Sequence, residues 1–553
     1  MNSSNLHIRI VSSLEKGLVG DPVEKYPELK SVSVLKGERL SFQLFMRTDH
    51  TEQTGSTRLF SVTADGADLK ARAVRQIYAD LPKYHFDDSD SNGLFIESES
   101  GLYPDVLEPL DGDRIRPAED TLTAIWFEGV FDEPGRRDVT VRVFENGSEI
   151  ASAQIGITVV DRALPAQELI FTQWFHCDCL ASYYGVPVFS EEHWKIIGNF
   201  LRLAAENGIN CILTPVLTPP LDTEIGGERP TVQLIGVTSD GDGYKFDFSL
   251  LKRYIDLALS CGIKYFEISH LFTQWGAAFA PKVVMKAGGE ERRIFGWDTP
   301  GTEGEYPRFL AAFLPELVSF LKGEGILGNC RFHISDEPSA EHLENYLKAK
   351  SVVEPFLSGC VVIDALSSVD FFKKGIVKTP VPSTDHIEPF LGEDIKERWA
   401  YYCCGQWNKV GNRFIAYPAF RNRILGVQLY KFGISGFLQW GYDFYYSMGS
   451  RRLINPYLTQ SGDGQVPSGD AFSVYPGNGG EPLPSTRLYV FYEAIQDMSA
   501  LALCEKVIGR EKVIGLIDGL AGGAVTFDSY PKNPDYILEL REKINGIIAG
   551  GGL

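Results

Sequence analysis

The chain has 553 residues, of which 44% are hydrophobic and 23% charged, and its formal net charge is −20. This composition is typical of a globular protein with a large core, and it excludes a disordered or fibrous chain. The acidic residues are spread along the chain without any Lys- or Arg-rich tract, which argues against nucleic acid or an anionic membrane as a partner.

The termini and the cysteines indicate where the protein resides. The N-terminus, MNSSNLHIRIVSSLEKG, lacks a basic segment followed by an apolar run, so no secretory signal is predicted. No apolar stretch approaches the roughly 20 residues of a membrane helix. The nine cysteines include no C-x-x-C pair, and several lie inside apolar runs, which favours reduced, buried thiols. We therefore expect a cytoplasmic protein.

Residues 1–162 are predicted to form an N-terminal antiparallel β-sandwich domain. Short β-rich runs recur there, among them LHIRIVSSL, STRLFSVTADG and RRDVTVRVFENG, and Asp-Gly, Asn-Gly and Pro-Gly turns separate them. Several runs alternate polar and apolar side chains, as VTVRVF does, and this period is typical of strands with one buried face. At roughly 150 residues per domain, the remaining length leaves room for at least one further domain.

After Leu164-Pro165, strand-like and helix-like segments alternate. Helices are predicted in EEHWKIIGNFLRLAAENG, FSLLKRYIDLALSCG and FLAAFLPELVSFLKGEG, and each is followed by a buried strand-like run. Seven or eight such strands favour a (β/α)8 barrel of the TIM type over an open doubly wound sheet. We assign residues 163–505 to this barrel and residues 506–553, with the stretch YILELREKINGII, to a C-terminal helical extension on its outside.

In such barrels the active site forms at the C-terminal ends of the strands. The residues there are aromatic and acidic, with few Lys or Arg, and no phosphate-binding loop motif occurs in the chain, so a phosphate ligand is disfavoured. The candidate substrate-binding residues are Trp174, His176, Asp178, His333, Trp440 and Tyr442 at strand ends, with Trp275 in a long loop as a rim residue.

Two adjacent carboxyls, Asp336 and Glu337, lie at the end of the predicted fourth strand, in RFHISDEPSAEHLENY. Pro338 disfavours helical geometry at Glu337, so both side chains can lie at the barrel mouth. Two carboxyls this close do not both ionise easily, which raises one pKa and lets one residue hold a proton at neutral pH. A protonated acid beside an ionised one suits the cleavage of a glycosidic C–O bond.

The adjacency of the pair favours one type of glycoside hydrolysis. Most glycosidases place their two carboxyls across the sugar, on different strands. In the substrate-assisted exception, the 2-acetamido oxygen of the sugar attacks the anomeric carbon, so the enzyme needs no nucleophile. One carboxylate then stabilises the acetamido N–H, and its neighbour protonates the leaving oxygen and later activates water.

Several long motifs resemble one known family. HISDEP, QWFHCDCLASYYG, ILTPVLTPPLDT, EISHLFTQWG and PSGDAFSVYPG are similar, in order, to the catalytic region of glycoside hydrolase family 123 and the barrel proteins grouped as DUF4091, over residues 165–505. The resemblance implies an exo-acting, retaining β-N-acetylgalactosaminidase that requires neither a metal nor an organic cofactor. It implies Asp336 as the acetamido stabiliser and Glu337 as the general acid/base.

Several alternatives remain open at this point. A strand through HCDCL would put its cysteines on the face opposite His176 and Asp178, which disfavours a metal site there. His176, His333 and Asp178 fit either contacts with sugar hydroxyls or internal hydrogen bonds. Trp440 and Tyr442 fit either sugar contact or wall packing. Glu267 fits a structural role better. The rival functions are a glycosidase for another sugar and a non-catalytic carbohydrate-binding protein, although the retained acid pair argues against the latter.

Overall fold

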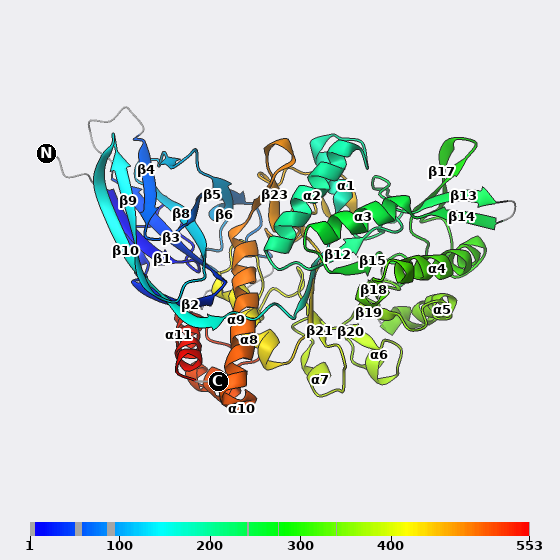
Figure 1. Ribbon diagram of the computed structural model, residues 1–553. Helices are drawn as coiled ribbons and strands as arrows, with labels where there is room; N and C mark the ends of the chain where they lie inside the picture. The colour runs from blue at the N-terminus through cyan, green and yellow to red at the C-terminus, as the bar shows by residue number, and fades with distance from the viewer. Residues whose placement is uncertain are drawn as a thin grey trace.

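The computed structural model describes residues 6–49, 58–85, 94–240, 243–274, 276–338 and 340–551. A β-rich N-terminal domain lies beside a larger α/β domain, and the C-terminal helices lie close to both (Figure 1).

The N-terminal domain consists of two five-stranded sheets that enclose an apolar core, in which the rings of Phe42 and Phe127 stack 5.3 Å apart. All strand pairs are antiparallel except β2 with β10. The predicted sandwich is confirmed. In spatial order, one sheet contains β1 (Leu6–Ser12), β3 (Glu38–Thr48), β8 (Leu122–Phe131), β5 (Lys70–Ala79) and β6 (Gly101–Pro109), and the other β2 (Ser31–Lys36), β10 (Ser148–Ala163), β9 (Gly135–Glu145), β4 (Phe60–Asp65) and β7 (Arg114–Ile115).

The second domain is built on eight parallel strands, which confirms the predicted (β/α)8 barrel. A parallel bridge between Ser383 and Tyr401 brings the two ends of the sheet together. Two of the strands, β20 and β21, have only three residues each, and these were the least visible in the sequence. In spatial order the strands are β20 (Thr379–Val381), β19 (Val361–Ala365), β18 (Cys330–Phe332), β15 (Tyr265–Ile268), β12 (Cys211–Thr214), β11 (Ile170–Gln173), β22 (Gly436–Gln439) and β21 (Trp399–Tyr401).

Each barrel strand leads into a helix. The first long one begins at Ser190, whose hydroxyl accepts a hydrogen bond from the His193 amide, and it ends before Gly208, whose φ of 80° suits glycine. A Cβ at Gly208 would lie 2.8 Å from Ile495, so this helix end packs tightly. The helices are α2 (Glu191–Glu206), α3 (Ser249–Ser260), α4 (Glu305–Gly323), α5 (Leu343–Val353), α6 (Asp370–Lys373), α7 (Glu388–Leu391), α8 (Phe420–Lys431) and α9 (Thr486–Ile508).

Three insertions extend the loops at the strand ends. HCDCL begins a helix, α1 (Cys177–Tyr184), and does not continue the strand β11, which corrects the strand geometry considered from the sequence. Long loops after β12 and β15 form a small sheet at the end of the domain farthest from the N-terminal domain (Figure 1). It contains β13 (Gly236–Asp240), β14 (Gly243–Asp247), β16 (Val283–Ala287) and β17 (Glu290–Phe295), and β23 (Val474–Pro476) pairs with β24 (Pro482–Pro484) after β22.

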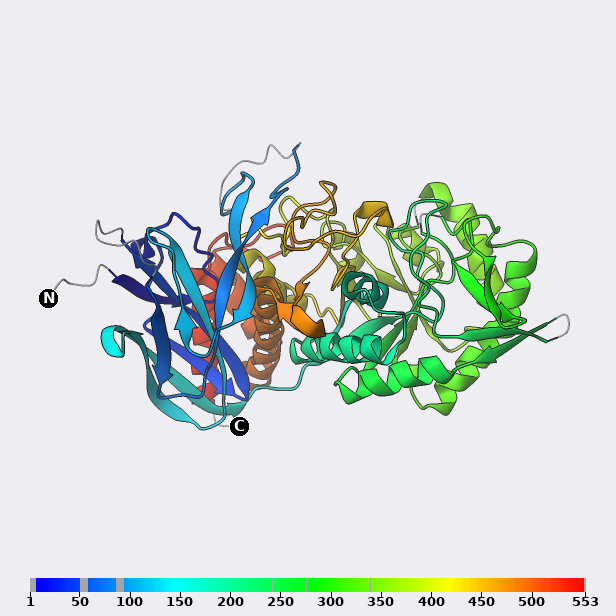
Figure 2. The same ribbon diagram turned by 90° about the horizontal axis from the view of Figure 1, so that it is seen from above.

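The C-terminal helices contact both domains. Helix α9 is the eighth barrel helix and runs through the boundary expected at residue 505, and α10 (Arg510–Ala521) and α11 (Asp535–Gly550) follow it. Helix α11 packs against α9 and also lies along β2 and β10 (Figure 2). Glu542 of α11 accepts hydrogen bonds from Ser33 of β2. The extension therefore reaches beyond the barrel's outside. Within the ranges described above, no helix is long and apolar enough to cross a membrane.

Candidate active site

The two adjacent carboxyls lie just beyond the C-terminal end of β18. Glu337 is exposed and has a left-handed backbone, with φ at 45°, a conformation that is uncommon for residues other than glycine and recurs at functional sites. The Tyr401 hydroxyl, at the end of β21, donates a hydrogen bond to Glu337 Oε1 at 2.8 Å. One oxygen of this carboxyl is thereby fixed from a different strand.

Asp336 is the more buried of the two. Burial raises the pKa of Asp336 well above its usual value, the negative charges of Glu337 and then Asp222 raise it further, and His333 opposes the shift. In the free protein, Asp336 therefore holds a proton more readily than an exposed aspartate does. The expectation that one pKa of the pair rises agrees with this direction.

A third carboxyl, Asp222, lies on the loop after β12. It is part-buried and left-handed, with φ at 47°. Burial raises the pKa of Asp222 to about 7, with Asp470 and Glu337 also raising it and Arg229 lowering it. Sequence reasoning missed Asp222, because the loop residues LTPPLDTEIGG carry no periodic signal that would place one of them beside β18.

Beneath the pair, His333 lies between two buried carboxyls. Its Nε2 donates to Glu267 Oε1 at 2.6 Å, and its Nδ1 lies 3.7 Å from Asp364 Oδ1. Burial lowers the pKa of His333, but the contacts with Asp364 and Glu267 outweigh it and raise the pKa to about 9. The imidazole is therefore positively charged at neutral pH.

The same Glu267 carboxylate also fixes Trp174. Glu267 Oε1 accepts from Trp174 Nε1, and its Oε2 accepts from the Thr172 hydroxyl, both at 2.7 Å. Trp174 and His333 are each at most 3% exposed, so the structure places them as a buried layer under the carboxyls. The structural role expected for Glu267 agrees with its three hydrogen bonds.

A second histidine, His270, stacks on His333 with 4.1 Å between ring centroids. It is fully buried, and neither ring nitrogen has a hydrogen-bond partner among the residues that the structure describes. Burial lowers the pKa of His270 well below its usual value, and the His333 charge lowers it further. Two adjacent imidazoles thus differ in charge, one neutral and one cationic.

His176 and Asp178 both contact the guanidinium of Arg229. Asp178 binds the guanidinium through two contacts of 2.7 Å, and His176 Nδ1 lies 3.1 Å from Arg229 Nη2. His176 Nε2 donates to the Trp440 carbonyl at 2.9 Å. Of the two readings left open by the sequence, the structure thus favours internal hydrogen bonds over sugar contacts for both residues. Arg229, which the sequence did not indicate, also donates to the Leu221 carbonyl, next to Asp222.

The aromatic candidates Trp440 and Tyr442 lie in different surroundings. Trp440 is 8% exposed, and its Nε1 donates to Asp470 Oδ2 at 2.7 Å. Tyr442 is fully buried, and its hydroxyl donates to the Phe200 carbonyl of α2. Of the two roles left open by the sequence for Tyr442, this position favours wall packing over sugar contact. Trp275 lies outside the described residues.

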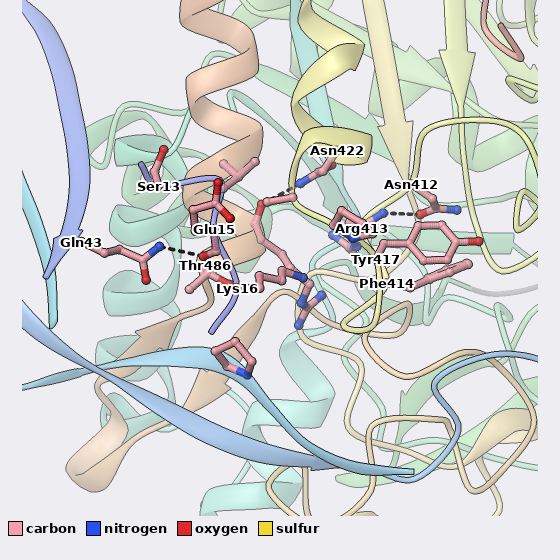
Figure 3. Close-up of a pocket in the computed structure, with 15 residues that line it drawn as sticks. Ser13, Glu15, Lys16, Gln43, Asn412, Arg413, Phe414, Tyr417, Asn422 and Thr486 are labelled. Atoms are coloured by element: carbon pink, nitrogen blue, oxygen red, sulfur yellow. Dashed lines mark hydrogen bonds between the residues drawn. The ribbon is translucent and has the colours of Figure 1, made fainter. Parts of the chain in front are cut away.

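A pocket between the two domains has different chemistry (Figure 3). Its lining includes Ser13, Lys16 and Gln43 from the N-terminal domain and Arg413 from the barrel. Lys16 Nζ donates to the Ile415 carbonyl at 2.8 Å, and burial lowers the pKa of Lys16 to about 7. These polar groups already bind protein partners, and none of Asp336, Glu337 and Asp222 lines the pocket. The strand ends therefore remain the candidate active site.

The described ranges contain no group of three or more His, Cys, Asp or Glu side chains arranged to hold a metal ion.

A parallel eight-stranded barrel with paired carboxyls at the end of its fourth strand is the class of fold and site found in (β/α)8 glycoside hydrolases. The profile of the glycoside hydrolase 123 catalytic domain matches residues 174–504. The chain therefore belongs to glycoside hydrolase family 123, as its motifs predicted.

Solved structures extend this comparison to the whole chain. A family 123 glycoside hydrolase from Clostridium perfringens, studied for glycolipid glycan hydrolysis, aligns with a TM-score of 0.73 and 15% identity over 98% of each chain. It shares the fold of both domains. A family 39 glycoside hydrolase from Bacteroides cellulosilyticus WH2 aligns over 88% of this chain and 82% of its own, with 11% identity and a TM-score of 0.34. A search of curated protein sequences finds no match.

Proposed function

We propose that the protein releases terminal β-linked N-acetylgalactosamine from glycans, with retention, by substrate-assisted catalysis at Asp336 and Glu337. The observation that carries this proposal is that both carboxyls come from adjacent residues at one strand end. The carboxyls of the neighbouring strands, Glu267 and Asp364, are fully buried against His333. The sugar's own acetamido oxygen then serves as the nucleophile.

Asp336 acts as the stabilising carboxylate in this mechanism. The acetamido N–H of the substrate donates to Asp336 and thereby favours its ionised form. The imidazolium of His333 opposes the effect of burial on the same carboxyl. The reaction requires Glu337 to supply the proton for the leaving oxygen.

Glu337 acts as the general acid and later as the general base. Its exposure lets it reach the leaving oxygen, and Tyr401 fixes Oε1, which leaves Oε2 for proton transfer. As the acetamido oxygen attacks the anomeric carbon, Glu337 protonates the departing oxygen, and an oxazolinium ion forms. Glu337 then takes a proton from the water that attacks the same carbon, which restores the acetamido group and gives the retained product.

The substrate class has independent support. Arg229, the arginine beside the Asp222 loop, is bound by Asp178, His176 and the Leu221 carbonyl, so its charge is already paired, which suits a neutral sugar. The structurally similar Clostridium perfringens enzyme was studied for glycolipid glycan hydrolysis, which supports a glycan as the substrate here.

The decisive test is hydrolysis of 4-nitrophenyl N-acetyl-β-D-galactosaminide by the wild type, Asp336→Asn and Glu337→Gln. The N-acetylglucosaminide and the plain galactoside serve as comparison substrates, and Asp463→Asn, an exposed acid paired with Arg452, is the control variant. We expect turnover of the galactosaminide alone, lost in both dyad variants and kept in the control. Comparable turnover of the plain galactoside would contradict an acetamido nucleophile, and faster turnover of the glucosaminide would contradict the sugar.

A further inference from the structure

Gln274 contains a buried donor that the fold leaves unused. It lies on the segment after β15, is 5% exposed, and its Oε1 accepts a hydrogen bond from the Asp222 amide at 2.9 Å. Its Nε2 has no hydrogen-bond partner among the described residues. Burying an amide donor without a partner is destabilising, and such a group in a folded protein points to a water or a ligand that completes it.

Asp222, whose backbone amide binds the Gln274 side chain, offers an acceptor in its carboxyl. Its backbone is held from both sides, by Gln274 at the amide and by the Ser450 hydroxyl at the carbonyl, at 2.7 Å. The left-handed backbone of Asp222 is strained for a residue with a side chain. In the described part of the chain its carboxyl accepts no hydrogen bond, and it lies close enough to Asp336 to influence that carboxyl electrostatically.

Arg229 fixes the Asp222 loop without binding the Asp222 carboxyl. One guanidinium nitrogen donates to the Leu221 carbonyl at 3.1 Å, while the others bind Asp178 and His176. Helix α1 and the loop after β12 are thereby locked together behind Asp222. A rigid support of this kind is what a binding residue needs to hold its geometry.

We propose that Asp222 and Gln274 bind one hydroxyl of the terminal sugar and are specificity-determining residues of the site. A sugar hydroxyl is both a donor and an acceptor. The Asp222 carboxylate accepts its hydrogen, and Gln274 Nε2 donates to its oxygen. The inference rests on the proposed function and adds to it the two residues, outside the dyad, that select the sugar by its hydroxyl pattern.

The binding mode predicts how substrate analogues behave. A site built to bind a hydroxyl group rejects an analogue that lacks it, because its own polar groups are then left unpaired. We expect the wild type to lose about 10- to 100-fold in kcat/KM on one of the 3-, 4- and 6-deoxy forms of 4-nitrophenyl N-acetyl-β-D-galactosaminide.

The test combines protein variants with deoxy substrate analogues, so that each variant's loss in kcat/KM is compared between the parent substrate and the analogue. Asp222→Asn tolerates the left-handed backbone and removes the charge of the acceptor, while Gln274→Glu keeps the acceptor for the Asp222 amide and removes the donor. Each variant should lose about 10-fold or more on the parent substrate and little or nothing further on the deoxy analogue that lacks the bound hydroxyl. Gln274→Glu carries the test alone if Asp222→Asn does not fold.

Asp120→Asn is the matched control, because Asp120 also has a left-handed backbone, with φ at 55°, but lies in the N-terminal domain. It should leave all rates unchanged. Equal losses by both site variants on the parent and on every deoxy analogue would overturn the inference, as would wild-type rates in Asp222→Asn.

Calorimetric binding of N-acetylgalactosamine separates this inference from the proposed function. Binding that is lost in Asp222→Asn, with no turnover by the wild type, would support the inference and contradict the hydrolysis. Turnover by the wild type that does not depend on Asp222 and Gln274 would contradict the inference alone. If the wild type neither binds nor hydrolyses the galactosamine compounds, both the inference and the proposed function are contradicted.

Discussion

Acidic residues in two regions of this molecule have different partners. At the contact of the N-terminal domain with the barrel helices, buried carboxylates pair with arginines: Asp105 with Arg487, Glu493 and Asp497 with Arg423, and Glu38 with Arg541. At the strand ends, Asp336, Glu337 and Asp222 lie together, and among the described residues only the neutral Tyr401 hydroxyl bonds to one of their carboxyls.

The difference separates carboxylates that stabilise the fold from the carboxyls that we propose to be catalytic or substrate-binding. An arginine beside a buried carboxylate offsets the cost of removing both charges from water. At the strand ends, no arginine of the described ranges binds these carboxyls directly. Burial raises the pKa of Asp336 and of Asp222 above their usual values, and the charges of neighbouring carboxyls raise both further. Raised carboxyl pKa values of this kind are typical of catalytic sites, in agreement with the proposed function.

The largest effect is expected from removing one carboxyl of the pair. Asp336→Asn or Glu337→Gln should lower kcat/KM by about 10²- to 10⁴-fold, the usual range for a catalytic acid or base. The temperature of unfolding should stay the same or rise, because the change relieves repulsion and leaves no cation unpaired. Rate assays and thermal melts of the same samples test this. Melting temperatures that fall as far as those of an interface variant would remove the distinction between the regions.

Breaking an interface pair should have the opposite signature. Arg487→Met leaves Asp105 buried without the guanidinium that contacts it at 2.8 and 2.9 Å, and we expect a loss of about 3–5 kcal/mol in the free energy of unfolding. Denaturant unfolding measures it. Arg452→Met, at an exposed pair with Asp463, is the control and should cost at most about 1 kcal/mol. Equal effects of the two variants would show that burial does not decide the strength of these pairs.

His333 shares features with both regions. It is a buried cation paired with carboxylates, and it lies beneath Asp336 and Glu337. Folding raises the pKa of His333 from 6.5 to about 9, so its stabilising contribution is complete below pH 6.5 and is lost as the pH rises through 9. For this shift the contribution is about 3 kcal/mol. The stability difference between the wild type and His333→Gln should therefore shrink by about this amount between about pH 6 and about pH 9.5.

Unfolding measured across this pH range tests the prediction, with the exposed His386→Gln as the control. A difference that stays constant with pH would mean that His333 is neutral in the folded protein. In that case the positive charge beneath Asp336 would be absent.

The smallest of these effects is expected at Tyr401. Tyr401→Phe removes one hydrogen bond to Glu337 and should lower kcat/KM about 10-fold, or about 1.4 kcal/mol. Tyr402→Phe is the neighbouring control, since the Tyr402 hydroxyl bonds to Asn422 at 3.1 Å. It should leave kcat/KM unchanged. Equal losses in the two variants would show that Tyr401 acts through the strand and not through Glu337.

Local patterns were sufficient to predict most of the fold. Alternation in VTVRVF predicted strand β9, and the helical periodicity ending at Gly208 predicted α2. Patterns failed where an element was too short to show a period, as in the three-residue strand β21 that carries Tyr401. They failed also at HCDCL, where an apolar run gave no sign of the helix α1.

The sequence by itself determined the sandwich, the barrel and the position of the adjacent carboxyls, because each depends on spacing along the chain. Tertiary structure decided which polar residues are available. It committed His176 and Asp178 to Arg229 and turned Tyr442 toward α2, and it brought Asp222 toward Asp336 from a distant loop. The physical reason is that a pairing between charges depends on distance in space, and the barrel brings together strand ends that are far apart in sequence.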